Sequence, residues 1–290
     1  MPSPLTSWSL DPLQLAPIAL VAVFYARRVR RLRRRGVDVP RWRTASFGTG
    51  IALLFLALAS PIEAIGQEEL FTFHMVQHVL IGDLAPLALL AGLTGPILRP
   101  VLALPLVERL RVLAHPFVAL PLWALNLGFW HLPFAYQGAL RHDALHAVEH
   151  LSFFAAGVVM WAAILETLPA PVWFGSGAKL GYVAGVRLYE TAIANVFLWA
   201  GGVFYPYYAR GEELWGISPG GDQVTAGAVM MVEGSLVTMA ALAWLFLRLA
   251  REGELRQDLL ERGLDPSAVR RAVRYGRADA LDAQEQSATR

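Results

Sequence analysis

Long apolar blocks constrain the fold of this chain more than any other feature of its sequence. A run of about 20 apolar residues is long enough for a helix to cross the hydrocarbon core of a bilayer. Seven such blocks lie at residues 11–27, 45–62, 71–98, 116–132, 143–168, 180–204 and 223–247. The sequence therefore predicts an all-α, polytopic membrane protein that forms a bundle of seven transmembrane helices.

The composition excludes several other classes of protein. Of the 290 residues, 56% are hydrophobic and 17% are charged, whereas about 25% are charged in soluble chains. A two-domain soluble enzyme, a disordered chain and a fibrous repeat are therefore not expected. The chain has no cysteine, which excludes disulfides, iron–sulfur clusters and cysteine-based zinc or copper sites.

The arginines are distributed unevenly among the segments that connect the apolar blocks. Nine arginines lie from Arg27 to Arg43, whereas the next connection carries Glu63, Glu68 and Glu69 and no basic residue. Because basic residues mark cytoplasmic loops, we expect the N-terminus outside and the C-terminus in the cytoplasm. The net charge is only +2, and an arginine run beside a span faces lipid headgroups. The expected partner of this run is thus membrane lipid and not nucleic acid.

The last forty or so residues differ from the rest in polarity. We expect residues 1–250 to form one transmembrane helical domain and residues 251–290 a polar cytoplasmic tail that is partly helical. Helical apolar spacing in the tail predicts one or two short helices with a break at residues 263–266, followed by a disordered end.

All seven histidines lie between His74 and His150, and the predicted topology brings six of them to the external side. The exception is His115, at the cytoplasmic end of the fourth block. Residues four apart share a helix face, so His74 pairs with His78, and His146 with His150. Imidazole with an optional thioether suits copper, zinc or haem iron. The candidate metal ligands are His74, His78, His131, His146 and His150, with Met75, His142 and Glu149 as weaker candidates.

Two further groups of residues have competing interpretations. Met230 and Met231 could reach the same site, but we interpret them as ordinary packing. Asp83, Glu190 and Glu233 lie inside apolar blocks, where a charge costs about 2.5–3.5 kcal/mol on insertion scales. They could form a proton or cation path below the histidines. We favour a buried ion-pair network, because Arg187 lies one turn from Glu190.

Three short motifs carry a resemblance to a known family. The stretches are His74-Met-Val-Gln-His78, Trp130-His131-Leu-Pro133-Phe-Ala-Tyr136 and His146-Ala-Val-Glu-His150. Together with the seven blocks, they resemble the multi-spanning CtaG-type cytochrome c oxidase assembly proteins over about residues 45–250. A single-span, cysteine-containing copper chaperone shares the CtaG name, and the absence of cysteine excludes that type.

The resemblance implies a non-enzymatic assembly factor for a haem–copper cytochrome c oxidase. It implies a multi-pass protein of the bacterial plasma (inner) membrane that binds copper at the external face. Its partners would be an oxidase subunit, which receives the copper, and a periplasmic copper donor. The histidines that match the motifs are His74, His78, His131, His146 and His150.

Two alternatives stay open from the residues themselves. The protein could bind haem through two imidazoles from different spans. It could also be a membrane zinc metalloprotease, because His146, Glu149 and His150 have the His-x-x-Glu-His form of inverted zincins. Zinc or haem would then replace copper as the bound group.

Overall fold

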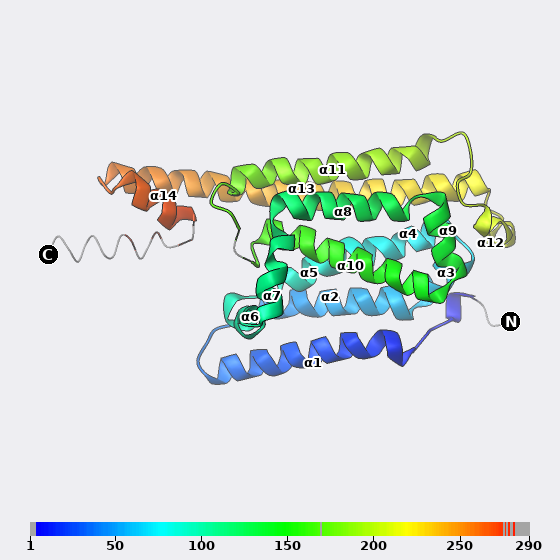
Figure 1. Ribbon diagram of the computed structural model, residues 1–290, viewed down its shortest axis with the longest axis horizontal. Coiled ribbons are helices and arrows are strands. Elements are labelled where there is room, and N and C mark those ends of the chain that lie inside the picture. Colours follow the sequence, from blue (N-terminus) through cyan, green and yellow to red (C-terminus); the bar gives the residue numbers. More distant parts are fainter. Residues whose placement is uncertain (1–3, 169, 275, 277, 279–280, 282–290) are drawn as a thin grey trace. The chain divides into compact units, whose positions relative to one another are not determined.

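The structure is a computed structural model that describes residues 4–168, 170–274, 276, 278 and 281. Within these residues every regular element is a helix (Figure 1). The α-helices are α1 (Pro12–Arg34), α2 (Arg41–Ala59), α3 (Pro61–Glu68), α4 (Phe71–Val79), α5 (Ala85–Ala91), α6 (Gly95–Leu102), α7 (Pro105–Leu110), α8 (Pro116–Trp130), α9 (Pro133–Arg141), α10 (Asp143–Leu165), α11 (Ser176–Trp199), α12 (Ala209–Trp215), α13 (Pro219–Glu261) and α14 (Pro266–Arg274). The short elements are η1 (Pro4–Thr6), the π-helix η2 (Leu80–Leu84), η3 (Arg111–Ala114) and η4 (Pro206–Tyr208).

Several of these helices can cross a membrane, as the sequence predicts. Four stretches are long and apolar enough: α2, the continuous run α4–η2–α5, α10 and α13. The pair Pro105–Ala114 and Pro116–Trp130, which is bent by 77°, makes a fifth candidate when its two helices are counted as one span. The predicted class, an all-helical membrane protein, is therefore confirmed. The count of seven spans and the orientation of the termini stay predictions.

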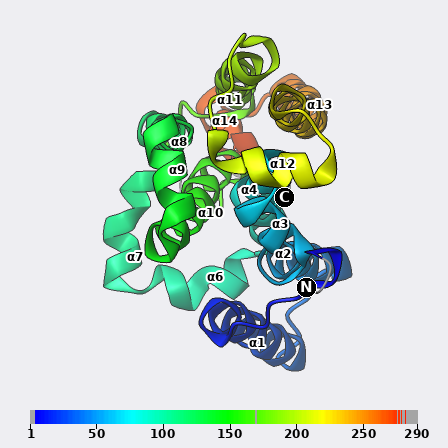
Figure 2. The same ribbon diagram turned by 90° about the vertical axis from the view of Figure 1, so that its right-hand side faces the viewer.

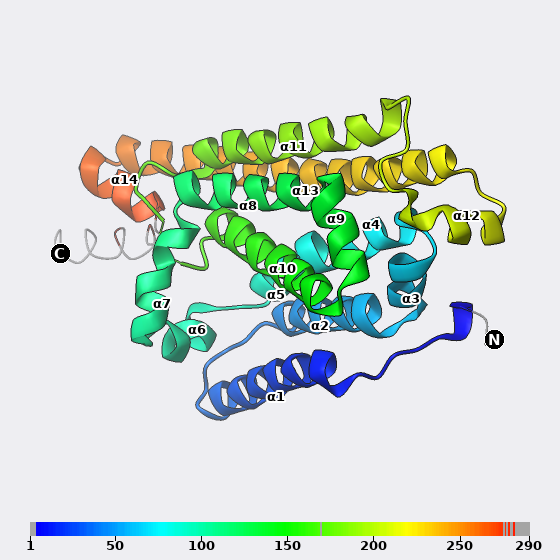
Figure 3. The ribbon, with the colours of Figure 1, turned by 45° about the vertical axis from the view of Figure 1, so that its right-hand side comes forward.

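The chain forms two compact units, one of Met1–Ala170 with Val186–Ser235 and one of Pro171–Gly185 with Leu236–Arg290. In the first unit α10 is central: it packs against α8 and α9 and also against α5 and η2. Figure 2 shows α10 between α9 and α4. Helix α2 covers α5, and α1 lies against α2 (Figure 3). This packing brings the two histidine-rich helices, α4 and α10, together.

The contact between α10 and the π-helix η2 is unusually close. A Cβ atom on Gly157 of α10 would lie 1.9 Å from the carbonyl oxygen of Gly82 in η2. Glycine is therefore required at position 157 for the two backbones to approach this far. π-Helical segments are rare and occur frequently at functional sites.

The second unit contains the end of α13 and the predicted tail helices. Helix α13 continues past residue 250 to Glu261, and α14 follows after Gly263, whose φ of +83° favours glycine. Leu259, Leu264 and Val269 are buried together in this unit. The disordered end predicted for the tail falls largely outside the described residues.

Candidate metal centre

Helix α4 holds the first histidine pair in a buried position. His74 and His78 are one turn apart, and their side chains are 0% and 5% exposed. Asp222 fixes the start of this helix, because its carboxylate accepts hydrogen bonds from the backbone N–H groups of Phe71 (2.7 Å) and Thr72 (3.0 Å). An acidic cap accepts hydrogen bonds from the free N–H groups of the first turn, and its negative charge interacts favourably with the helix dipole. The histidines thus lie on a helix whose first turn is anchored.

Helix α10 presents His146, Glu149 and His150 to the same place. Glu149 is fully buried, and its carboxylate oxygens lie 3.8 Å from His74 Nε2 and 3.7 Å from His78 Nε2. The ring centroids of His74 and His146 are 5.4 Å apart. We call His74, His78, His146, Glu149 and His150 the His–Glu cluster.

Two sets of ligand atoms in this cluster are close enough to hold one ion. The first set comes from His74, His146 and His150, and the second from His74, His78 and Glu149. Within each set the possible ligand atoms lie within 4.8 Å of one another. Either set provides three ligands, which is the number that open, exchangeable metal sites commonly use.

A second layer of polar groups sets the protonation of His74. Its Nδ1 lies 3.1 Å from the carbonyl oxygen of Gly66. Because a carbonyl only accepts, Nδ1 carries the ring hydrogen, and the unprotonated Nε2 accepts a hydrogen bond from His78 Nε2 (2.8 Å). Tyr208 also donates to Gly66 O (2.8 Å), and Tyr136 lies 2.9 Å from the Tyr208 hydroxyl. Burial raises the pKa of Tyr208 well above its ordinary value, so the phenol stays a donor.

Glu63 and Gln77 support the cluster from α3 and α4. Gln77 donates to the carbonyl oxygen of Ala57 (2.9 Å) and to the carboxylate of Glu63. The same carboxylate lies 3.9 Å from His146 Nδ1. Burial raises the pKa of Glu63 to about 7, against the lowering effect of the Gln77 hydrogen bond. These contacts hold the α10 histidine against α3.

Several polar atoms of the cluster have no hydrogen-bond partner among the described residues. They are His78 Nδ1, His146 Nε2, His150 Nε2 and both carboxylate oxygens of Glu149, all buried. Buried polar atoms are normally satisfied by a partner, and an ion explains an exception. The donor set therefore fits a metal with borderline character, such as copper or zinc.

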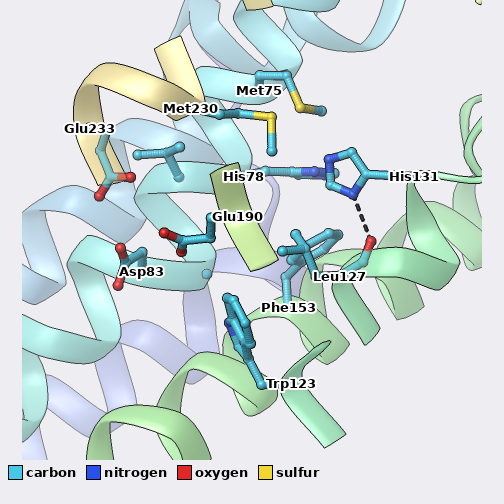
Figure 4. A pocket seen from close by; sticks show the side chains of 12 residues that line it. Met75, His78, Asp83, Trp123, Leu127, His131, Phe153, Glu190, Met230 and Glu233 are labelled. Atoms are coloured by element: carbon cyan, nitrogen blue, oxygen red, sulfur yellow. Dashed lines mark hydrogen bonds between the residues drawn. The ribbon is translucent and has the colours of Figure 1, made fainter. Parts of the chain in front are cut away.

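The other predicted residues lie apart from the cluster. His142 is exposed and precedes α10. His131 follows α8 and lines a cavity of about 60 Å³ beside the cluster, together with Met75 and His78 (Figure 4). The structure thus brings four of the five main candidates together with Glu149, and places His131 in the neighbouring cavity.

Asp83, Glu190 and Glu233 line the opposite end of this cavity (Figure 4). Asp83 accepts a hydrogen bond from Trp161 and is also hydrogen-bonded to Glu233. Arg187 lies 4.0 Å from Glu190 and donates to Ser235 (2.7 Å). The predicted pair of Arg187 and Glu190 is therefore present, whereas Asp83 and Glu233 are hydrogen-bonded to each other.

Comparison with known proteins assigns the family. A family model described as cytochrome c oxidase caa3 assembly factor (Caa3_CtaG) matches residues 23–252. The chain belongs to this family. The resemblance predicted from the three histidine motifs is thus confirmed, and an assembly-factor family indicates a non-catalytic role.

The relatives that match the chain are themselves uncharacterized and do not assign a function. The chain is 24% identical over 223 residues to uncharacterized proteins Mb0105 of Mycobacterium bovis and MT0111 of Mycobacterium tuberculosis. This match covers 69% of the chain but only 33% of each relative, so the chain spans about a third of their length. No solved structure matches the chain.

Sequence reasoning did not find the residues that support the histidines of this assembly factor. Asp222 and Tyr208 are more than a hundred residues from α4, and Glu63 was interpreted only as a topology signal. The one available signal was the run of tyrosines from Tyr205 to Tyr208 in a connection that is otherwise acidic. Tyr205 is buried there and donates to the carbonyl oxygen of His131 (2.7 Å).

Proposed function

We propose that this assembly factor binds copper at the His–Glu cluster and delivers it to a haem–copper oxidase subunit. The observation that carries the proposal is the cluster itself: four imidazoles and one carboxylate, all buried, in a family that assembles cytochrome c oxidase. The protein would act without catalysing a reaction. Its copper is cargo.

The geometry of the histidine pair suits an ion that enters and leaves. His74 Nε2 and His78 Nε2 are 2.8 Å apart and share one hydrogen. Two nitrogens at about 2.0–2.1 Å from a metal in tetrahedral geometry are separated by about 3.3 Å. A small rotation of one ring, with the His78 hydrogen moved from Nε2 to its own Nδ1, which has no hydrogen-bond partner among the described residues, therefore converts the hydrogen bond into a two-ligand site.

The room around the cluster favours an ion over the two alternatives. The imidazoles that face each other from α4 and α10 are close together, with ring centroids 5.4 Å apart for His74 and His146 and 5.7 Å apart for His78 and His150, so a haem macrocycle does not fit between them. The neighbouring cavity of about 60 Å³ is far below the roughly 300–1,000 Å³ of ordinary ligand pockets. A peptide substrate of a metalloprotease would not reach Glu149 without a large rearrangement.

The remaining parts of the proposal concern location and partners. The acidic connections on the cluster side and the arginine-rich connections on the other support an external site in the bacterial inner membrane. A periplasmic copper donor would load the protein there, and the oxidase subunit would remove the ion.

The test is the copper content and visible spectrum of the detergent-purified protein. We expect copper in the wild type, and its loss in His74→Ala/His78→Ala. His142→Ala is the matched control, because His142 is exposed and lies outside the cluster. In cells that lack the native protein, the control variant should restore oxidase assembly and the double variant should not.

Equal copper in the wild type and the double variant would refute the site. A Soret band in the purified protein would replace copper with haem. Zinc in place of copper, together with proteolysis that Glu149→Gln abolishes, would favour the metalloprotease.

A further inference from the structure

The cavity beside the His–Glu cluster contains a second set of metal-ligating atoms. Met75 from α4, Met230 from α13 and His131 after α8 line one end of it, next to His78 (Figure 4). Figure 4 shows the two thioether groups and the His131 ring turned toward the same point. These side chains come from three separate elements.

His131 presents a free lone pair to this point. Its Nδ1 lies 2.7 Å from the carbonyl oxygen of Leu127, and a carbonyl only accepts, so the hydrogen is on Nδ1. Its Nε2 is then unprotonated. This atom is buried and has no hydrogen-bond partner among the described residues, and the side chain is 9% exposed.

The His131 ring is also held in place. Tyr205 donates to the His131 carbonyl oxygen (2.7 Å), and the ring packs against Phe153 and Phe197, with centroids 6.2 Å and 5.7 Å away. The ring therefore cannot rotate to bring its unprotonated Nε2 to a hydrogen-bond donor elsewhere. Ordinary packing explains two buried methionines, but it does not explain an unsatisfied imidazole nitrogen directed at them.

Met230 is distinguished from its neighbour Met231 by its environment. The sulfur of Met231 accepts a hydrogen bond from Arg187 (2.8 Å) and does not line the cavity. Met75 and Met230 are 1% and 8% exposed and line the cavity. Two thioethers and an imidazole form a soft donor set that favours Cu(I) over divalent ions.

We propose that Met75, His131 and Met230 form a second metal site that takes Cu(I), separate from the His–Glu cluster and joined to it through His78. This inference rests on the proposed function. His78 is hydrogen-bonded to His74 in the cluster and also lines the cavity. It thus provides a common ligand through which an ion passes from one donor set to the other.

The experiment measures Cu(I) coordination and affinity in the intact, detergent-purified protein under reducing conditions. X-ray absorption of the wild type should show sulfur scattering around copper. In Met75→Leu/Met230→Leu we expect this scattering to disappear and the affinity for Cu(I), and for Ag(I) as a redox-inert probe, to fall at least tenfold. Met231→Leu is the matched control and should behave as the wild type.

The two proposals fail in different ways. Zn(II) binding at the His–Glu cluster should survive Met75→Leu/Met230→Leu and be lost in His146→Ala/Glu149→Gln. Cu(I) bound only by nitrogen or oxygen, with an unchanged affinity in the methionine variant, overturns the second site and leaves the first. Sulfur-bound Cu(I) without any Zn(II) or Cu(II) binding overturns the cluster and leaves the second site.

Folding of the variant does not limit the test. Methionine to leucine conserves volume and typically costs less than about 1.5 kcal/mol. Selenomethionine-labelled wild type gives an independent readout, because copper scattering at the selenium edge is expected if the site exists. Its absence counts against the second site.

Discussion

At the scale of single residues, Glu149 makes opposite contributions to folding and to metal binding. Its carboxylate is fully buried, and its closest cationic candidates are imidazole nitrogens 3.7 and 3.8 Å away. An ionised carboxylate without a hydrogen bond costs more to bury than the neutral amide of glutamine, which is close to it in shape. Glu149→Gln should therefore raise the free energy of unfolding of the metal-free protein by about 1–3 kcal/mol.

The same substitution should weaken metal binding. Loss of the carboxylate ligand should lower the affinity of the cluster for copper or zinc at least about tenfold. Thermal unfolding with and without metal measures both effects: the melting temperature rises in the metal-free sample, and the increase upon adding metal shrinks. Glu213→Gln, at an exposed position, is the control. A parallel fall of stability and affinity would indicate a purely structural role for Glu149.

The residue scale also shows where sequence reasoning was strong and where it ended. The four-residue spacing predicted the pairs His74–His78 and His146–His150, because helix geometry is local. His131 shares its cavity with Met230, about a hundred residues later in the chain, and its ring is oriented by a hydrogen bond to Leu127. Glu149 likewise lies near His74 and His78 only because side chains of α4 and α10 meet in the folded chain. Such tertiary contacts are not encoded in the spacing of any motif.

At the scale of elements, the approach of α10 to η2 determines whether the histidine helices meet. Gly157→Ala would place a methyl group 1.9 Å from the Gly82 carbonyl oxygen. The clash is with backbone, which cannot relieve it by changing rotamer as a side chain can. We therefore expect the substitution to lower the free energy of unfolding by about 3 kcal/mol, the upper end of the usual cost of overpacking. A fall in the melting temperature, together with reduced metal binding, should accompany the substitution.

The control for this prediction is another helical glycine. Gly138 in α9 has open space where a Cβ would lie. Gly138→Ala should stabilise the protein by about 0.5–1 kcal/mol, because alanine restricts the unfolded chain. Equal melting temperatures for the two alanine variants would show that α10 and η2 can separate without cost.

The elements themselves were predicted to different degrees. Helices are present at each of the seven predicted apolar blocks, since apolar length is readable from sequence. The π-helix η2 was not predicted, because it arises from the packing of Gly82 against α10. The short helices α3 and α9 were also missed, although Ser60 before Pro61 is a normal start signal.

At the scale of the whole molecule, the number of spans rests on α1 and α11. Both are long helices, of 23 and 24 residues, but neither is among the clearly apolar candidates. Arginines crowd the end of α1, and α11 carries Lys179, Arg187 and Glu190. Seven spans require both to cross, and then the His–Glu cluster lies toward the external side.

Cysteine labelling decides this, because the chain has no cysteine of its own and each introduced thiol reports alone. Thr6→Cys and Asp38→Cys flank α1, and Val172→Cys and Glu213→Cys flank α11, all at exposed positions. A membrane-impermeant maleimide should label Thr6→Cys and Glu213→Cys in intact cells, and Asp38→Cys and Val172→Cys only after permeabilisation. We expect this labelling pattern because basic residues mark the cytoplasmic segments of a membrane protein. If both thiols that flank one helix react in intact cells, that helix does not cross, and the seven-span bundle is wrong.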